Sequence, residues 1–227
     1  MGKSEHHLTV NDTHGTPENI LRVITKVLGP IGLDPFSHPD AIVPCELAIM
    51  LPCMTHARCV LCGWSTSVMH MPGEAPMKCE TKNCISEITL ATSTPPPSPF
   101  AKHTEYGDGL SFCWDGHGLN YSNGPYSILD VWCKKAAREG DENVLLVPAR
   151  TGNVSWPEGA GLADVEVRLG RVTHRGSKTH APFHQLLLYY GKRVELAVLG
   201  FSELGDVRVH PRHMTLRPDP AERWRKT

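Results

Sequence analysis

Apolar residues near the start of the chain recur at helical spacing and are followed by a short continuous apolar run. The helical pattern continues to Leu28 after Thr16 and Pro17, which we expect as the N-cap and the first helical residue, and Gly29 ends it. The next apolar run, 31–35, predicts a buried strand that ends on an acidic residue. In open α/β sheets, ligands bind at such strand ends.

The same alternation of helix and strand patterns returns in the second half of the chain. A helix is predicted from about 127 to 139, and a continuous apolar run over 144–149 predicts a central strand that is covered on both faces. Further strands are predicted at 165–172, 185–190 and 207–210. Helices that flank apolar strands in this way predict an α/β fold with three layers.

Between residues 45 and 102 the pattern is interrupted by cysteines, glycines and short polar runs. This segment closes with the proline-rich stretch 94–99, which is typical of an extended spacer. We therefore predict a main domain formed by 1–44 and 103–227, with 45–102 as an insertion that ends in a proline-rich linker.

Overall composition is that of an ordinary globular protein, with 227 residues, 40% of them hydrophobic and 21% charged. The sequence has no apolar stretch long enough to span a bilayer and begins without a signal-peptide pattern, so we expect a cytoplasmic protein without membrane contact. Its net charge is −1, so any binding of nucleic acid must rely on local basic patches.

Two cysteine pairs within the insertion have the spacing of a metal site. Cys59 and Cys62 form a CxxC turn followed by glycine, and Cys79 and Cys84 form a second pair. Four thiolates arranged in two pairs suit a closed tetrahedral Zn²⁺ site, and the spacing resembles a zinc ribbon. A segment this short and polar would take most of its folding free energy from the metal, so the predicted role of zinc is structural.

Other assignments for these cysteines stay open. Cys53, His56 or His70 are possible substitute ligands, and Cys53 or His56 could replace Cys84. Alternatively, all four cysteines are unrelated buried thiols.

A candidate catalytic loop lies between a short predicted strand at 119–121 and the predicted helix at 127–139. Its residues are Asn123, Gly124, Pro125 and Tyr126. An Asn side-chain oxygen and the next backbone carbonyl can accept both hydrogens of an exocyclic amine and return its lone pair to nitrogen, while an aromatic ring stacks on a flipped base. The pattern therefore favours transfer to a base amine, although a tetrapeptide of this kind also occurs as an ordinary turn before a helix.

The order of several short segments along the chain resembles the phage-type (Dam-like) DNA N6-adenine methyltransferase family. The matching segments are Gly15-Thr16-Pro17, Leu33-Asp34-Pro35, Asp108-Gly109-Leu110 with Trp114, Asn123-Gly124-Pro125-Tyr126 and Leu146-Val147-Pro148-Ala149-Arg150-Thr151. The resemblance covers most of residues 14–191 apart from the insertion. It implies a Rossmann-like fold of S-adenosylmethionine (SAM)-dependent methyltransferases, SAM as methyl donor and DNA as substrate.

Carried over by position, the resemblance assigns donor binding to Thr16, Pro17, Asp34 and Pro35, and assigns the acceptor base to the Asn123 loop. One departure concerns Gly124, since the family has proline at this position and glycine is less preorganised. The basic residues after 165, among them Arg168, Arg171 and His174, are candidate phosphate contacts or part of a solvated strand edge.

Two other functions remain open at this point. Cytosine-N4 or an RNA base uses the same amine chemistry as adenine. A non-enzymatic protein that binds nucleic acid could also keep a degenerate methyltransferase fold and bind through the zinc module.

Overall fold

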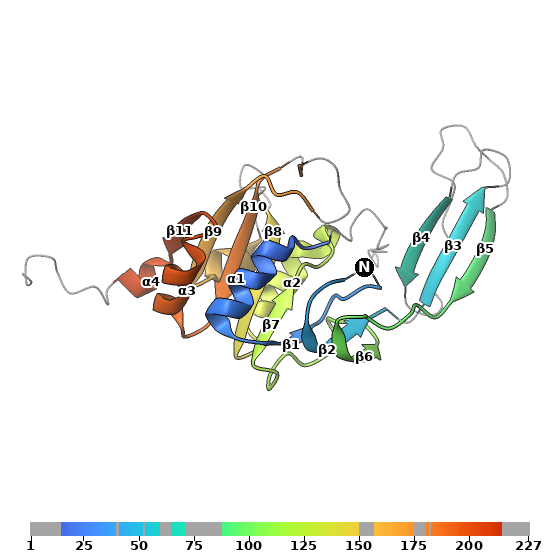
Figure 1. Ribbon diagram of the computed structural model, residues 1–227, viewed down its shortest axis with the longest axis horizontal. Helices are drawn as coiled ribbons and strands as arrows, with labels where there is room; N and C mark the ends of the chain where they lie inside the picture. Colours follow the sequence, from blue (N-terminus) through green and yellow to red (C-terminus); the bar gives the residue numbers. More distant parts are fainter. Residues whose placement is uncertain are drawn as a thin grey trace, which may run out of the picture.

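The computed structural model describes residues 15–39, 41–51, 53–59, 65–70, 88–149, 157–174, 180–181 and 183–214. Its α-helices are α1 (Glu18–Leu28), α2 (Leu129–Ala136), α3 (Val194–Phe201) and α4 (Pro211–Met214), and its short 3-10 helices include η2 (Tyr126–Ile128) and η3 (Glu158–Leu162). Figure 1 shows these helices packed around one large sheet, with a second, smaller sheet beyond its edge.

The large sheet has eight strands in the order β11-β9-β10-β8-β7-β1-β2-β6. Their bounds are β1 (Ile31–Asp34), β2 (Cys45–Met50), β6 (Ala101–Tyr106), β7 (Leu119–Ser122), β8 (Glu142–Pro148), β9 (Val165–Gly170), β10 (Gln185–Tyr190) and β11 (Asp206–Val209). Strands β6, β2, β1, β7 and β8 are mutually parallel. The reversed strand β10 lies between β8 and β9 and is antiparallel to both.

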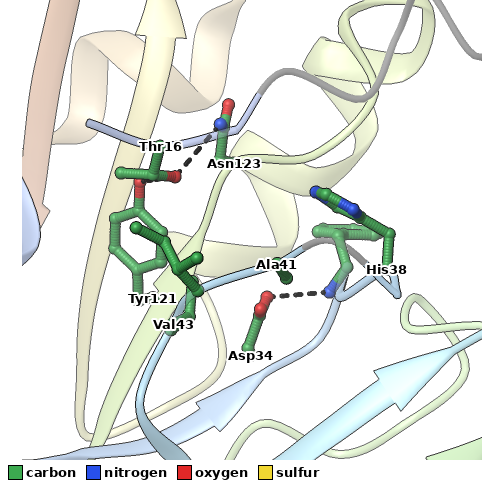
Figure 2. Close-up of a pocket in the computed structure, with 9 residues that line it drawn as sticks. Thr16, Asp34, His38, Ala41, Val43, Tyr121 and Asn123 are labelled. Atoms are coloured by element: carbon green, nitrogen blue, oxygen red, sulfur yellow. Dashed lines mark hydrogen bonds between the residues drawn. The ribbon is translucent and has the colours of Figure 1, made fainter. Parts of the chain in front are cut away.

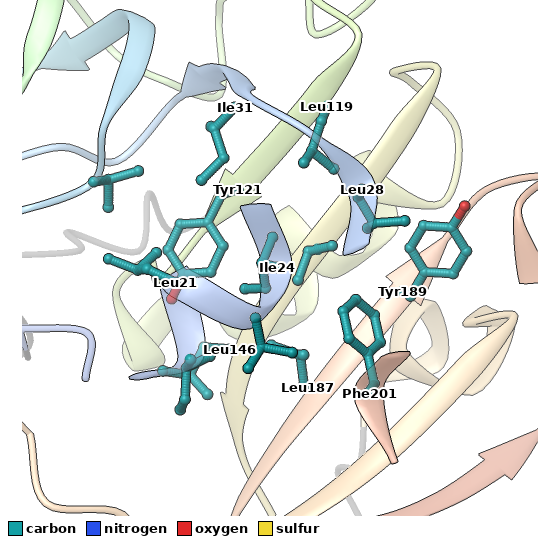
Figure 3. Close-up of a cluster of buried hydrophobic side chains, with 14 of the residues drawn as sticks. Leu21, Ile24, Leu28, Ile31, Leu119, Tyr121, Leu146, Leu187, Tyr189 and Phe201 are labelled. Atoms are coloured by element: carbon teal, nitrogen blue, oxygen red, sulfur yellow. The ribbon is translucent and has the colours of Figure 1, made fainter. Parts of the chain in front are cut away.

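Both faces of this sheet are covered, which explains why the central strands β7, β8 and β10 are buried along almost their whole length. On one face, α1 and α3 contact each other and pack on a core that includes Ile24, Tyr121, Leu146 and Phe201 (Figure 3). On the other face, α2 and η3 contact each other over a second core, whose largest buried side chains include Trp114. The predicted three-layer α/β arrangement is therefore confirmed.

The smaller sheet lies inside the predicted insertion. Its antiparallel strands are β3 (Cys53–Cys59), β4 (Ser65–His70) and β5 (Ile88–Ser93), in the order β4-β3-β5. By contrast, Cys45–Met50, which the sequence placed in the insertion, forms strand β2 of the large sheet and pairs with β1 and β6.

The proline-rich linker is held against the large sheet. The hydroxyl of Tyr106 donates to the carbonyl of Pro95 at 2.9 Å, and the backbone N–H of Ser98 donates to Oγ1 of Thr104 at 3.2 Å. Tyr106 is also the strand partner of Met50, the last residue of β2. The linker therefore passes the corner where β2 ends before the chain enters β6 at Ala101, beside the first residue of β2.

Most predicted elements appear within a few residues of their expected bounds, but the start of α1 differs. The predicted N-cap, Thr16, is not the cap residue, because Pro17 holds that position and no side chain caps the helix. The Thr16 hydroxyl instead contacts Tyr121. At the other end, Gly29 adopts φ = 89° and its N–H donates to the carbonyl of Thr25, as expected of a glycine that ends a helix.

Among the described residues, no helix combines the length and the apolar character that crossing a membrane requires.

Candidate functional site

Two of the predicted site segments meet at the centre of the large sheet. Strand β1 ends at Asp34, and its neighbour β7 ends at Ser122, directly before Asn123. The order of the strands reverses here, because the chain continues from β1 to β2 on one side while β7 lies on the other. In open α/β sheets, ligands bind outside the carboxyl ends of the strands at this kind of switch point.

The residues before α1 reach the same place. Helix α1 leads into β1 through a short turn after Leu28, so its C-terminus lies at the opposite edge of the sheet and its N-terminus at the carboxyl edge. Thr16 is thereby brought beside Tyr121 and Asn123, more than 100 positions later in the sequence. Three predicted segments, around 16, 34 and 123, therefore form one site.

Side-chain hydrogen bonds join two of these segments, those around residues 16 and 123 (Figure 2). The hydroxyls of Thr16 and Tyr121 are 2.8 Å apart, and Nδ2 of Asn123 donates to Oγ1 of Thr16 at 3.2 Å. Thr16 and Tyr121 are both buried, and burial raises the pKa of the Tyr121 hydroxyl well above its usual range. Thr16 thus accepts from the amide nitrogen and fixes the orientation of the Asn123 side chain.

Asp34 supplies a buried acidic group to the same site. Its side chain is 3% exposed, and burial raises the pKa of its carboxyl from 3.8 to about 7. The backbone N–H of Phe36 donates to Oδ1 of Asp34 at 3.3 Å and counteracts part of this rise. A buried acid with a displaced pKa at a strand end is typical of functional sites.

The pocket between these segments is small and has mixed chemistry. Its lining residues are Thr16, Asp34, Phe36, His38, Ala41, Ile42, Val43, Tyr121 and Asn123. It encloses about 10 Å³, roughly the room that one water-sized sphere needs. A ligand as large as a nucleoside therefore enters only if the segments that line the pocket move apart.

The rest of the predicted catalytic loop is fixed by the start of the next helix. Nε1 of Trp132 donates to the carbonyl of Pro125 at 3.0 Å, and Trp132 is fully buried. The N–H of Ile128 donates to the same carbonyl at 3.3 Å. Gly124 is buried and packs against the ring of Phe36. The loop is thus held by Trp132 at Pro125 and by the ring of Phe36 at Gly124.

Tyr126 lies beside the start of β10. Its ring contacts Phe183 edge-on at 6.0 Å between centroids, and its hydroxyl lies 3.5 Å from Oε1 of Gln185. Nε2 of the fully buried Gln185 in turn lies 3.5 Å from Nε2 of His174. His174 is only 6% exposed, so its candidate role as a phosphate contact is not supported by its position.

The remaining predicted residues contribute less to this site. Pro17 precedes α1 and Pro35 follows β1, but neither belongs to the pocket lining. Arg168 is exposed on β9 and pairs with Glu166. Arg171 is exposed just beyond the same strand.

Three of the four predicted zinc ligands, Cys62, Cys79 and Cys84, lie outside the described residues, and Cys59 is described only as the last residue of β3. Within the described part of the chain, no group of three or more metal-ligating side chains is found.

Sequence reasoning missed several residues of the site. Tyr121 was expected only as part of a strand, although its position two residues before the loop indicated that it lies close to the site. Phe36, His38 and Val43 follow the strand β1 that was predicted to carry a ligand site, and this was the available signal. Gln185 and Phe183 gave no such indication, because their contact with Tyr126 depends on the reversed strand β10.

Comparison of the chain with protein-family models and with curated proteins gave no match.

Proposed function

We propose that this protein is a SAM-dependent DNA methyltransferase that modifies the N6 amine of adenine. The observation that carries the proposal is the meeting of Thr16, Asp34 and Asn123 at the switch point of the sheet. These residues come from three segments that were selected by their resemblance to one family, and that resemblance implies a shared site. The reversed strand between β8 and β9 also agrees with the Rossmann-like fold of methyltransferases.

The chemistry of the pocket suits the proposed donor. SAM supplies a methyl group on a positively charged sulfur, and Asp34 offers a carboxylate whose charge is otherwise suppressed by burial. Phe36, Ala41 and Val43 provide apolar surface for an aromatic base. Binding must separate the lining segments, so we expect the donor to order the site as it enters.

The Asn123 loop would hold the acceptor. The side-chain oxygen of Asn123 and the carbonyl of Gly124 accept the two hydrogens of the adenine amine, which returns the nitrogen lone pair from the ring. Thr16 holds the Asn123 amide by its nitrogen, so the amide oxygen is the atom assigned to the base. Tyr126 would stack on the flipped adenine, and its contact with Phe183 limits how far its ring can rotate.

The test is incubation of the purified chain with tritiated SAM and unmethylated DNA, followed by digestion to nucleosides. Label in N6-methyldeoxyadenosine is expected, and it should disappear in Asn123→Ala. Label in N4-methyldeoxycytidine would show that cytosine is the acceptor base, and label in a parallel incubation with RNA but not with DNA would show that RNA is the substrate. Absence of both transfer and donor binding by calorimetry would refute the enzyme and favour a non-enzymatic protein that binds nucleic acid.

We also propose a structural zinc ion in the insertion, bound by Cys59, Cys62, Cys79 and Cys84. Cys59 ends β3 and pairs with Ile88, the first residue of β5. Cys62 lies three positions after Cys59, and Cys84 lies four positions before Ile88. A residue spans at most about 3.6 Å, so the chain can bring Cys62 and Cys84 to the same end of the small sheet.

Metal analysis of the purified full chain tests the zinc proposal. About one zinc ion per chain is expected, as in a four-cysteine site, and Cys59→Ser should lose it. Cys113→Ser is the matched control, since Cys113 is an exposed free cysteine outside the insertion. Native protein without metal, or equal zinc content in both variants, would exclude this site.

A further inference from the structure

Phe36 lies between the donor segment and the acceptor loop. It follows Asp34 and Pro35 directly after β1, and its side chain lines the small pocket beside Asp34. Its ring also packs against the core, where its centroid is 6.0 Å from Trp114 and 5.8 Å from Trp132. The side chain thus lies between the pocket and two buried aromatic groups.

Gly124 provides the space that the ring of Phe36 occupies. A Cβ atom built at Gly124 would lie 2.8 Å from Cδ2, 3.1 Å from Cε2 and 3.2 Å from Cγ of Phe36. The first distance is too short for two carbon atoms, so the ring would have to shift. The backbone at Gly124 is outside the left-handed region. Space, not backbone conformation, therefore requires glycine here.

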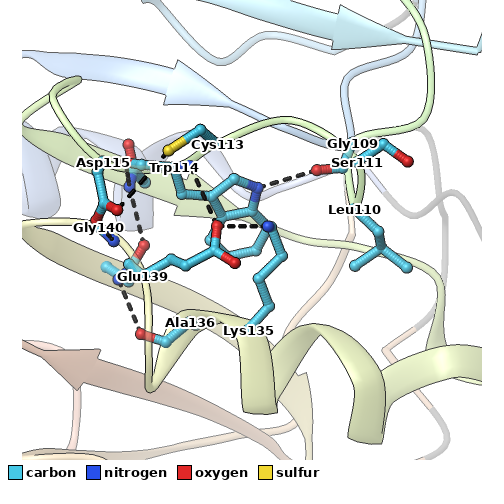
Figure 4. Close-up of polar contacts among 12 residues, drawn as sticks. Gly109, Leu110, Ser111, Cys113, Trp114, Asp115, Lys135, Ala136, Glu139 and Gly140 are labelled. Carbon is cyan, nitrogen blue, oxygen red and sulfur yellow. Dashed lines mark hydrogen bonds and ion pairs between the residues drawn. The ribbon is translucent and has the colours of Figure 1, made fainter.

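The two tryptophans behind Phe36 leave the ring little room to retreat. Both are fully buried, and each indole N–H is used: Trp114 donates to the carbonyl of Gly109, and Trp132 to that of Pro125, each at 3.0 Å. Figure 4 shows that Trp114 is further enclosed by Lys135, whose Nζ lies 5.5 Å from the centre of the ring. A side chain added at position 124 would therefore push Phe36 toward the pocket.

We infer that Phe36 is a positioning residue that replaces, by packing, the rigidity that proline would give to the second position of the catalytic loop. Its ring fills the hollow above Gly124 and connects the donor segment with the acceptor loop. Phe36 and Gly124 are thus packed as a pair, because a side chain at position 124 would displace the ring of Phe36. This inference rests on the proposed function for its consequence in catalysis, but the packing itself does not depend on it.

A stability cycle tests the packing without any assay of activity. Gly124→Ala is expected to lower the melting temperature by about 5 °C, the usual effect of overpacking in a chain of this size. In the background of Phe36→Ala, Gly124→Ala should lower the melting temperature by no more than Gly161→Ala does. Gly161 is the matched control because a Cβ there meets nothing within 4 Å. An equal loss from Gly124→Ala in both backgrounds would overturn the inference.

Turnover tests the positioning role, with SAM held at saturation. Gly124→Pro alone should lower kcat by about tenfold, because the displaced ring misplaces the loop. In the Phe36→Ala background the same change should raise kcat, since proline then restores the rigidity that the missing ring provided. If Gly124→Pro lowers kcat equally in both backgrounds, Phe36 has no positioning role. If no variant transfers methyl groups while the stability cycle behaves as expected, the proposed function fails and the packing stands.

Discussion

Asp34→Asn isolates the energetic effect of a buried carboxyl group without changing the size of the side chain. Asparagine keeps an oxygen that can accept the N–H of Phe36, so the local turn is preserved. The substitution removes the negative charge that the Asp34 carboxylate carries when the pH is above its pKa. Because the folded protein raises that pKa from 3.8 to about 7, the charged form is disfavoured by burial.

The magnitude follows from the displaced pKa. A rise of about three units corresponds to about 4 kcal/mol at 1.4 kcal/mol per unit. The folded state holds the proton more tightly, so this destabilisation is absent below the unfolded pKa of 3.8 and is complete above about 7. Between about pH 5 and pH 8, wild type should therefore lose about 2.5 kcal/mol of unfolding free energy relative to Asp34→Asn.

Urea unfolding of both proteins across this range is the appropriate assay, since other titrating groups are common to the two chains and cancel in the difference. We expect the variant to be the more stable protein at pH 8, by an amount that shrinks as the pH falls. Parallel stability curves for the two proteins would refute the reasoning, because Asp34 would then titrate alike in the folded and unfolded states.

Further predictions concern the hydrogen bonds that hold the loop. Thr16→Val should lower kcat by about tenfold and Thr16→Ser by much less, because serine keeps the oxygen that accepts from Asn123; equal kcat values in the two variants would show that the hydroxyl is not needed. Trp132→Phe should lower the unfolding free energy by about 1 kcal/mol in urea, because the buried carbonyl of Pro125 loses one of its two donors and keeps the N–H of Ile128, and an unchanged midpoint would contradict this. SAM affinity, measured by calorimetry, should weaken below about pH 7 in wild type and stay level in Asp34→Asn, since the cationic donor favours the ionised carboxylate.

The fold was predictable where one local pattern determined the structure. Five of the six residues of β10, Gln185–Tyr190, are apolar or aromatic, and all six are buried because helices cover both faces of the sheet. Helix α1 carries its apolar residues on one side, and Gly29 marks its end. In such segments the burial pattern and the local conformation point to the same element.

Prediction failed where distant residues decide the outcome. Thr16 has the chemistry of an N-cap, but Tyr121 and Asn123 offer its hydroxyl two partners that the sequence does not reveal. His174 belongs to a segment rich in basic residues and was therefore expected at the surface. It is buried instead, beside Gln185 at the start of β10.

The sequence predicted the segments of the site one by one. Only the order of the strands in the sheet shows that these segments lie together. Sequence order placed Asp34 and Asn123 at strand ends, but it did not show that β1 and β7 are neighbours. Gly124 illustrates the same limit. The resemblance places proline where this sequence has Gly124, and from the sequence the glycine indicated a less rigid loop. In the structure, the ring of Phe36 occupies the space beside Gly124, although Phe36 is 88 positions earlier in the chain.

The position of the insertion follows from the geometry of parallel strands. Strands β2 and β6 are parallel neighbours, so the chain between them must cross from the carboxyl edge of the sheet back to its amino edge. A helix usually makes such a crossover. Here the described parts of the connection are the small sheet β3–β5 and the extended linker that Tyr106 and Thr104 hold against β6. Because β2 ends at the carboxyl edge, the insertion begins on the side of the sheet where Asp34 and Asn123 meet. Under the proposed function, DNA that reaches this edge approaches the side of the sheet on which the insertion begins, and a contact between the proposed zinc module and DNA would follow from that position.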